Sequence, residues 1–209
     1  MKVLGLIGVD KYDLIHYLAK LLQRLGQKVL VIDGSSRKAL TATLPMQNTV
    51  FDFGGVDFVS GLDKAKANVH LNDYDFVIID FGFQIGNKLI AKCDEIWMIS
   101  DEQKHNIINL QNVKLSPQQP RFAVIRSETP NKLNNYFLQL LAPLGITQNT
   151  MYKITENKES RRNRMRIMYQ NIVSMKTLGD DILHVISLMI TPYFTEREIN
   201  AAIKSVRRE

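Results

Sequence analysis

Short apolar segments alternate with longer helix-forming segments, and this alternation limits the fold more than any other feature of the chain. The apolar segments are rich in Val, Ile and Leu, which is typical of strands buried on both faces of a sheet. Candidate strands are residues 2–8, 28–33, 74–80, 94–99, 121–126 and 151–155. Apolar residues at helical spacing favour helices over 12–25, 157–169, 177–190 and 195–208, and the segments 84–92, 102–114 and 131–142 are polar or helical. The pattern predicts an α/β fold, a single doubly wound and mostly parallel sheet with helices on both faces.

We expect one domain over residues 1–209, with a basic, helical C-terminal part at 157–209. The net charge is +6, and it is unevenly distributed. Residues 1–120 hold 13 Lys and Arg against 13 Asp and Glu, whereas residues 121–209 hold 14 against 8. Such an excess favours a polyanion or an anionic membrane as partner, although a solvated basic face explains the same charge pattern. Residues 41–72 show no firm pattern, and their glycines suggest turns.

Several classes of site and location are disfavoured. The single cysteine, Cys93, excludes an internal disulfide framework, and no Cys/His spacing indicates a metal site. Cys93 and Trp97 lie in apolar surroundings and are expected in the core, while His16 and His184 are expected at its edge. No apolar run is long enough to span a membrane, and the N-terminus lacks a signal-peptide pattern, so we expect a cytoplasmic protein.

In doubly wound sheets, ligands bind beyond the carboxyl ends of the strands, which directs attention to the loop after the first strand. That loop reads GVDKYDL over residues 8–14. A phosphate-binding loop needs small residues, whose backbone N–H groups surround phosphate oxygens, and a lysine for the outer phosphates. Gly8 and Lys11 meet this description, but one glycine and one lysine alone are a weak signal.

A wider set of segments gives this loop its context. The runs LAKLLQRLGQKVLVIDGS (18–35), YDFVIIDFG (74–82) and CDEIWMISDEQ (93–103) resemble the ParA/MinD family of deviant P-loop (SIMIBI) ATPases, as does the segment 154–189. The chain is similar to the branches associated with pilus, secretion and cellulose machinery. This resemblance implies a P-loop fold, often a dimer, that uses ATP to switch its placement on DNA, membrane or a partner protein.

The loop departs from the family pattern at several positions. With Lys11 aligned on the family's second lysine, Leu6 stands at the signature lysine, Asp10 at the last glycine and Tyr12 at the magnesium-binding hydroxyl. Asp10 would place a negative charge near a triphosphate. Tyr12 lacks the compact aliphatic hydroxyl that magnesium takes from Ser or Thr. The sequence therefore favours a degenerate site.

Two aspartates of the family pattern remain. The resemblance implies that Asp33 helps to place the attacking water and that Asp80 reaches magnesium through water, so these are the catalytic candidates if the chain is active. Together with Gly8 and Lys11 they form a vestigial nucleotide site. Acidic residues at strand ends also cap the following helix or turn, and this reading explains Asp33 and Asp80 almost as well. Ile125 stands where the family commonly has an adenine-reading asparagine, and Arg126 matches a neighbouring arginine.

The segment NKESRRNRMRIMY at 157–169 is the most basic part of the chain. We expect a partner or a polyanion to bind its arginines, which are Arg161, Arg162, Arg164 and Arg166. The alternative is an exposed helix on which Glu156 and Glu159 are local partners. The last helix, 195–208, lacks the large apolar residues of a membrane-docking helix, and we expect it to pack against the domain or a partner.

These observations lead to three functional hypotheses, the last of which is a structural subunit whose basic C-terminal third docks an acidic protein. The first is a pseudo-ATPase, a non-catalytic scaffold or positioning factor in a bacterial pilus, secretion, flagellar or cellulose assembly. The second is an active partition-type ATPase that binds ATP and non-specific DNA. Under the first hypothesis we expect protein partners and neither a cofactor nor a metal. A homodimer, nucleic acid and peripheral membrane contact stay open.

Overall fold

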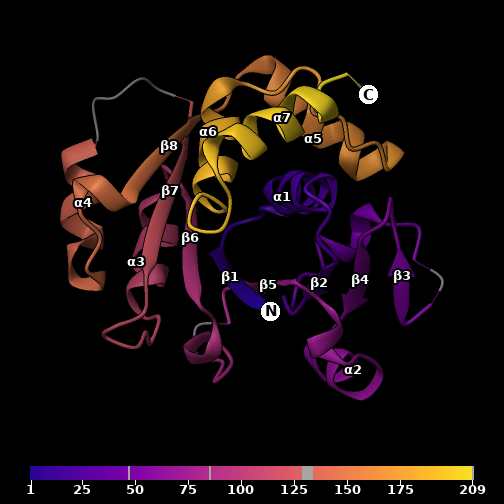
Figure 1. Ribbon diagram of the computed structural model, residues 1–209. Coiled ribbons are helices and arrows are strands. Elements are labelled where there is room, and N and C mark those ends of the chain that lie inside the picture. The colour runs from indigo at the N-terminus through magenta and orange to yellow at the C-terminus, as the bar shows by residue number, and fades with distance from the viewer. Residues whose placement is uncertain (47, 85, 129–133, 209) are drawn as a thin grey trace.

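The structure is a computed structural model that describes residues 1–46, 48–84, 86–128 and 134–208 (Figure 1). One eight-stranded sheet crosses it in the order β3-β4-β2-β5-β1-β6-β7-β8, and only the edge strand β3 is antiparallel to its neighbour. The strands are β1 (Lys2–Gly8), β2 (Val29–Asp33), β3 (Val50–Asp52), β4 (Asp57–Ser60), β5 (Phe76–Gly82), β6 (Glu95–Asp101), β7 (Arg121–Ser127) and β8 (Met151–Thr155). All six predicted strands are present, each within two residues of its expected bounds. The predicted fold class is confirmed.

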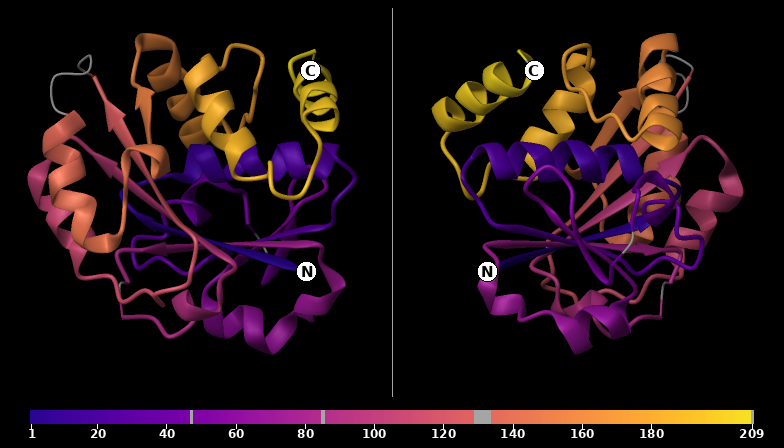
Figure 2. Two further views of the ribbon diagram at one scale, coloured as in Figure 1. Left: turned by 60° about the vertical axis from the view of Figure 1, so that its left-hand side comes forward. Right: turned by 90° about the vertical axis from the view of Figure 1, so that its right-hand side faces the viewer.

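Helices cover both faces of the sheet, as Figure 2 shows. The α-helices are α1 (Tyr12–Arg24), α2 (Leu62–Asn68), α3 (Lys104–Gln111), α4 (Asn134–Leu141), α5 (Lys158–Gln170), α6 (Asp180–Leu188) and α7 (Glu196–Val206). Buried residues of α1, α5, α6 and α7 share one core with one side of the strands. Buried residues of α2, α3 and α4 share a second core with the other side. The central strands are therefore buried on both faces, which explains their nearly continuous apolar sequences.

Residues 41–72 contain elements that the sequence pattern did not reveal, namely β3, β4 and α2. β3 and β4 are only three and four residues long, and β3 is half-exposed. The glycines expected to mark turns do so, because Gly54, Gly55 and Gly61 all have positive φ. The segment 84–92, which was expected to be polar or helical, forms only a short 3₁₀ turn at Ile90–Lys92 among its described residues.

The last helix packs on the domain itself. Ile199, Ala202 and Val206 of α7 are buried in the core that contains α1, and Figure 2 shows α7 beside α1. The hydroxyl oxygen of Thr195 caps this helix by accepting the N–H of Glu198. We expected this segment to pack against the domain or against a partner, and it packs against the domain.

Individual core predictions can also be checked. Trp97 is 1% exposed and stacks on Phe122, with ring centroids 4.4 Å apart. Cys93 is buried, and burial raises the pKa of its thiol to about 12, so the thiol stays protonated at neutral pH. His16 is buried and lies within 2.7 Å of the hydroxyl of Thr43, whereas His184 is exposed. In the described part of the chain, no helix is long and apolar enough to cross a membrane.

Candidate functional site

The loop between β1 and α1 is held tightly against the neighbouring strand β6. Gly8 has φ +117°, and a Cβ atom there would come within 1.9 Å of the carbonyl oxygen of Ile99. The next N–H, of Val9, donates to that same oxygen at 3.0 Å. Only glycine fits this backbone and this close approach, so Gly8 has a structural reason to be glycine whether or not a phosphate binds above it.

Lys11 points into the protein. Its side chain is 1% exposed, and its Nζ lies 2.7 Å from Oδ1 of Asp80 at the end of β5. The same ammonium donates to the carbonyl oxygens of Gly8 and Val9, at 3.2 and 3.3 Å. An ammonium has three protons, and these three acceptors can take all of them. Asp80 also accepts the N–H of Gly82 at 2.8 Å, so both partners of this buried ion pair are satisfied within the chain.

Asp33, at the end of β2, lies directly beside Asp80 in the sheet register. One oxygen of its carboxylate accepts the N–H and the hydroxyl of Ser35, at 3.0 and 2.6 Å. The other accepts the N–H and the hydroxyl of Thr41, at 2.8 and 2.7 Å. The carboxylate thus organises the loop that follows β2, as a side chain that caps a turn does.

The first turn of α1 carries a second buried ion pair. Asp13 is 1% exposed and accepts two hydrogen bonds from the guanidinium of Arg126, at 2.8 and 2.6 Å. Burial by itself would raise the pKa of Asp13, but the charge and hydrogen bonds of Arg126 hold that pKa below its usual value. Arg126 is the last residue but one of β7, so this bidentate pair links the first helix to the far half of the sheet.

Arg126 and its partners extend toward α5. The Nε of Arg126 lies 2.5 Å from Glu156, which follows β8. Arg164 of α5 approaches the same carboxylate at 3.6 Å and places its guanidinium 5.6 Å from the ring centre of Tyr12. Burial acts to lower the pKa of Arg126, but Asp13 and Glu156 raise it, so the guanidinium remains charged. Four elements therefore meet in one buried charge network.

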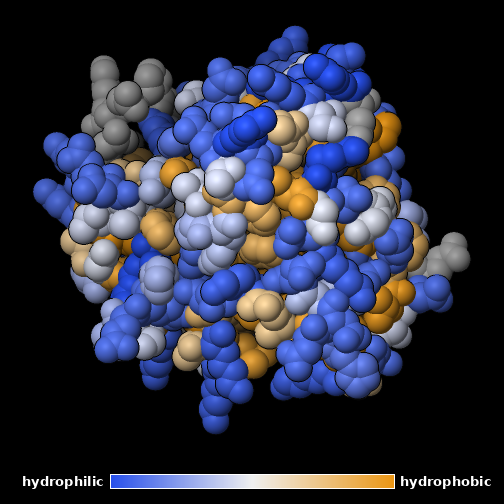
Figure 3. All heavy atoms as spheres, in the orientation of Figure 1, coloured by the Kyte–Doolittle hydropathy of each residue, from blue (hydrophilic) through white to orange (hydrophobic). Residues whose placement is uncertain are grey.

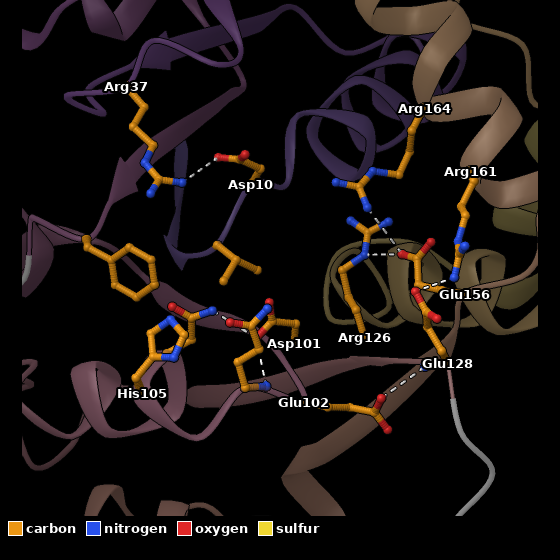
Figure 4. Close-up of a pocket in the computed structure, with 14 residues that line it drawn as sticks. Asp10, Arg37, Asp101, Glu102, His105, Arg126, Glu128, Glu156, Arg161 and Arg164 are labelled. Carbon is orange, nitrogen blue, oxygen red and sulfur yellow. Dashed lines mark hydrogen bonds and ion pairs between the residues drawn. The ribbon is translucent and has the colours of Figure 1, made fainter.

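Two hollows lie above these residues at the carboxyl edge of the sheet. The larger, about 810 Å³, is drawn in Figure 4 and has both acidic and basic walls. Its charged lining includes Asp101, Glu102, Glu128, Arg126, Arg161 and Arg164. The smaller, about 340 Å³, lies over Gly8, Lys11 and Asp80. Asp10 and Arg37 line both and approach each other at 3.9 Å. Among the described residues, no group of three or more His, Cys, Asp or Glu side chains is placed to hold a metal ion.

Comparison with known proteins shows which solved structures share this fold. No protein-family model and no curated protein matches the chain. A plasmid partition protein from Borrelia burgdorferi bound to AMPPNP superposes with a TM-score of 0.61, at 15% identity, over 92% of this chain and 99% of that one. MinD in the MinC:MinD complex of Aquifex aeolicus gives 0.58 at 12% identity, over 100% and 95%. Apo McdA of Cyanthece gives 0.57 at 13%, over 99% of both chains.

This chain has the ParA/MinD fold. Similarity at these identities establishes the architecture, and the chemistry must be judged from the residues present. Leu6 and Tyr12, two of the departures from the ParA/MinD loop, have definite structural roles. Leu6 is fully buried in the core below α1, and Tyr12 is buried with its ring under Arg164. Both positions are thus occupied by packing residues.

The arginines of α5 do not form one patch on this domain. Arg164 turns inward to the charge network, and its side chain is 28% exposed. Arg161 forms an ion pair with Glu128 across the large hollow (Figure 4). Arg162 is exposed and Arg166 is half-buried. Of the acidic partners proposed from the sequence, Glu156 contacts Arg164, while Glu159 instead accepts the hydroxyl of Thr177 at 3.1 Å.

Sequence reasoning missed Asp13 as a site residue, although Asp13 holds Arg126. The two lie 113 positions apart, so no local motif connects them. A signal was present all the same. An aspartate opens the first helix and an arginine ends a buried strand, and both positions lie on the carboxyl edge of a parallel sheet. Opposite charges placed at one edge of a sheet in this way are candidates for a buried pair.

Proposed function

We propose that this chain is a ParA/MinD family member whose nucleotide site has become structural, and that it acts as a non-catalytic scaffold or positioning factor in a bacterial assembly. The observation that carries the proposal is the buried ion pair of Lys11 and Asp80. The lysine that would contact phosphate instead forms an ion pair with the aspartate that would reach magnesium through water. Each group has become the other's partner.

The residues at the site do not fit MgATP. To contact a phosphate, Lys11 would have to leave all three of its present acceptors, which are Asp80 and the carbonyl oxygens of Gly8 and Val9. Asp10 adds a further negative charge to the wall where a phosphate would lie. At the position of the magnesium hydroxyl, Tyr12 is packed against Arg164, which leaves the metal without that ligand.

The scaffold role is supported by what remains intact. The sheet is continuous from β3 to β8, and buried side chains form a core on each of its faces. Proteins of this fold assemble with other proteins, as the solved MinC:MinD complex illustrates. We place the chain in the cytoplasm, in a pilus, secretion, flagellar or cellulose assembly, where it would hold a partner in position without spending ATP.

Titration calorimetry with ATP and Mg²⁺ tests the proposal, together with a phosphate-release assay. We expect no saturable heat and no turnover. The variant Asp10→Gly keeps Lys11 and Asp80 and removes one negative charge, so it reports whether charge alone prevents binding; we expect it to remain inactive. Sub-micromolar MgATP binding with turnover by the native chain would overturn the proposal. If retention on mixed-sequence DNA at about 50 mM salt accompanied it, the result would favour the partition-type ATPase.

A further inference from the structure

The outer side of α5 carries a row of positive charges. Lys158, Arg162 and Arg166 follow one another at intervals of four residues, so they share one side of the helix with steps of about 6 Å along its axis. Lys158 and Arg162 are exposed and Arg166 is half-buried. Within the described residues, no carboxylate forms an ion pair with these three, whereas the neighbouring Arg161 is paired with Glu128. We call the three residues the cationic row.

The cationic row is not needed to form the helix. Like charges four residues apart repel each other and destabilise a helix slightly. The acidic residue of α5, Glu159, accepts the hydroxyl of Thr177 at 3.1 Å instead of pairing with the row. The helix is held by the capping box at Asn157 and by its buried residues, among them Ile167. The cationic row therefore presents charge that an anion outside the domain can neutralise.

Exposed apolar side chains continue along α5 to its C-terminal end. Met165, Tyr169 and Ile172 are 56%, 74% and 49% exposed, and we call them the apolar row. Ile172 lies just past the helix, after Asn171 in the left-handed conformation, and its N–H donates to the carbonyl oxygen of Arg166 at 3.3 Å. This bond fixes Ile172 beside the last turn. None of the three side chains lines the hollows at the carboxyl edge of the sheet, so the apolar row is presented on the outside of a helix.

The two rows overlap along α5. Met165 directly precedes Arg166, and Tyr169 lies about two turns beyond Arg162, so cations and apolar groups share one side of the helix. In Figure 3 most of the visible face is hydrophilic, with small hydrophobic areas between charged side chains, one of them at the upper right where Figure 1 draws α5. A molecule that covers this side must offer apolar groups and negative charge close to each other.

A membrane with anionic lipids offers both over its whole surface. Its headgroups neutralise lysine and arginine wherever these fall, and the acyl region below takes up apolar side chains without a complementary cleft. Tyrosine is enriched at this boundary because its ring is apolar and its hydroxyl is polar. Long basic side chains reach back to the headgroups while their apolar neighbours enter. The composition of the two rows is therefore that of a helix that lies on a membrane.

Other partners and another helix fit these observations less well. The buried centre of a protein interface is depleted of charged side chains, and here cations alternate with apolar residues. Nucleic acid binds through many phosphate contacts, and three cations beside an apolar row supply few. The second amphipathic helix of the basic part, α7, buries Ile199 and Val206 in the domain, so its apolar side is not available to a membrane.

We propose that the outer side of α5 is a lipid-binding surface that attaches the protein peripherally to an anionic membrane. The apolar row enters the boundary between headgroups and acyl chains, and the cationic row contacts lipid phosphates. This inference goes beyond the function proposed above, because it concerns another surface and does not require that ATP binding has been lost.

The test is co-sedimentation of the full chain with lipid vesicles in the absence of nucleotide. One set of vesicles contains equal parts of phosphatidylcholine and phosphatidylglycerol, and the other contains phosphatidylcholine alone. We expect the chain to bind the anionic vesicles and to bind the neutral ones more than about tenfold more weakly. Binding should decrease as salt is raised from ~0.1 to ~1 M, because the Debye length falls from about 10 Å to about 3 Å.

Neutralising variants locate the contact. Lys158→Gln with Arg162→Gln removes two cations and should weaken binding to anionic vesicles about 25-fold, because each cation near such a surface raises affinity about fivefold. The matched control is Lys64→Gln with Lys66→Gln on α2, which packs on the opposite face of the sheet. It removes the same charge and should change affinity less than about twofold, because those lysines lie beyond the Debye length from the membrane.

A fluorescent variant reports whether the apolar row enters the membrane. The emission of Tyr169→Trp should shift to shorter wavelength on anionic vesicles, after subtraction of the signal of the buried Trp97 measured in the native chain. The control Tyr136→Trp, on the exposed side of α4, should show no shift. Circular dichroism confirms that each variant is folded.

Several outcomes would overturn the proposal. They are absence of vesicle binding, equal binding to both kinds of vesicle, equal losses in the test and control variants, and bound Tyr169→Trp without a spectral shift. The same variants are titrated with mixed-sequence DNA and with an acidic helical peptide. If the chain bound either one through Lys158 and Arg162 but bound no vesicles, α5 would be assigned to that partner instead. Because no nucleotide is present, a failure here leaves the ATP experiment unaffected, and ATP turnover would leave vesicle binding standing.

Discussion

The sharpest prediction concerns Lys11. Replacing a structural lysine lowers the free energy of unfolding, whereas replacing a nucleotide-binding lysine mainly lowers the affinity for nucleotide. In Lys11→Met the side chain keeps similar length but loses its charge, and Asp80 remains buried with only the N–H of Gly82 as a described partner in the loop. Breaking a buried ion pair from one side costs about 3–5 kcal/mol. We expect Lys11→Met to lose about that much free energy of unfolding, a large share of the ~5–15 kcal/mol typical of a domain.

The assay is urea unfolding followed by fluorescence of Trp97, which lies in the core. A loss of this size lowers the midpoint by about 1–2 M urea for a domain of ordinary cooperativity. The exposed control Lys64→Met should change stability by less than about 0.5 kcal/mol. The double variant Lys11→Met with Asp80→Asn should be more stable than the sum of the single losses predicts, because it removes both charges together.

The reasoning is refuted by two results. One is a loss below about 1 kcal/mol in Lys11→Met with no coupling to Asp80→Asn, because the pair would then contribute little to folding. The other is a gain in stability when MgATP is added to the native chain. A ligand at a hundredfold excess over its Kd stabilises a protein by about 2.7 kcal/mol, so binding would be visible in the same unfolding curves.

Three further predictions follow from buried groups. Burial lowers the pKa of His16 from 6.5 to about 4, so between these pH values the unfolded chain binds a proton that the folded chain does not bind. The free energy of unfolding should therefore fall by about 3 kcal/mol as the pH drops from 6.5 to 4, and His16→Gln should remove this contribution in unfolding curves recorded over that range. Asp13→Asn leaves Arg126 buried without its bidentate partner and should cost about 3–5 kcal/mol in urea unfolding, against less than about 0.5 kcal/mol for the exposed control Asp63→Asn. Gly8→Ala forces a Cβ onto the carbonyl of Ile99 and should lower the melting temperature far more than Gly26→Ala, which has positive φ but open space and should cost about 1 kcal/mol.

The sequence revealed the central strands because each is buried on both faces, and the apolar run is then the strand itself. β5 and β6 illustrate this, since six of the seven residues in each are buried. β3 and β4 escaped notice for the opposite reason. They are short, lie at one edge of the sheet and are partly exposed, so neither a continuous apolar run nor a clear alternation marks them.

The positions of the candidate site were predictable, but their bonding was not. Parallel topology brings Lys11, Asp33 and Asp80 to one edge of the sheet, and the sequence was sufficient for that. Which acceptor Lys11 takes depends on where its side chain points and on a loop that turns at Gly8. No sequence pattern encodes these features. The same holds for Asp13 and Arg126, which are adjacent only because the fold brings their two elements together.

The structure shows which of the basic side chains behind the uneven charge already have an acidic partner inside the domain. Part of the C-terminal excess is used inside the domain, since Arg126 forms a buried ion pair with Asp13, which belongs to the first 120 residues. A basic residue that neutralises an internal carboxylate adds little to an external field, because the two charges largely cancel beyond a few ångströms. What remains exposed is the outer side of α5, where Arg162 lies on the same helix as the exposed apolar residues Met165 and Tyr169. A surface that combines apolar side chains with positive charge contacts other molecules through both, so it differs from the evenly basic face that the sequence alone suggested.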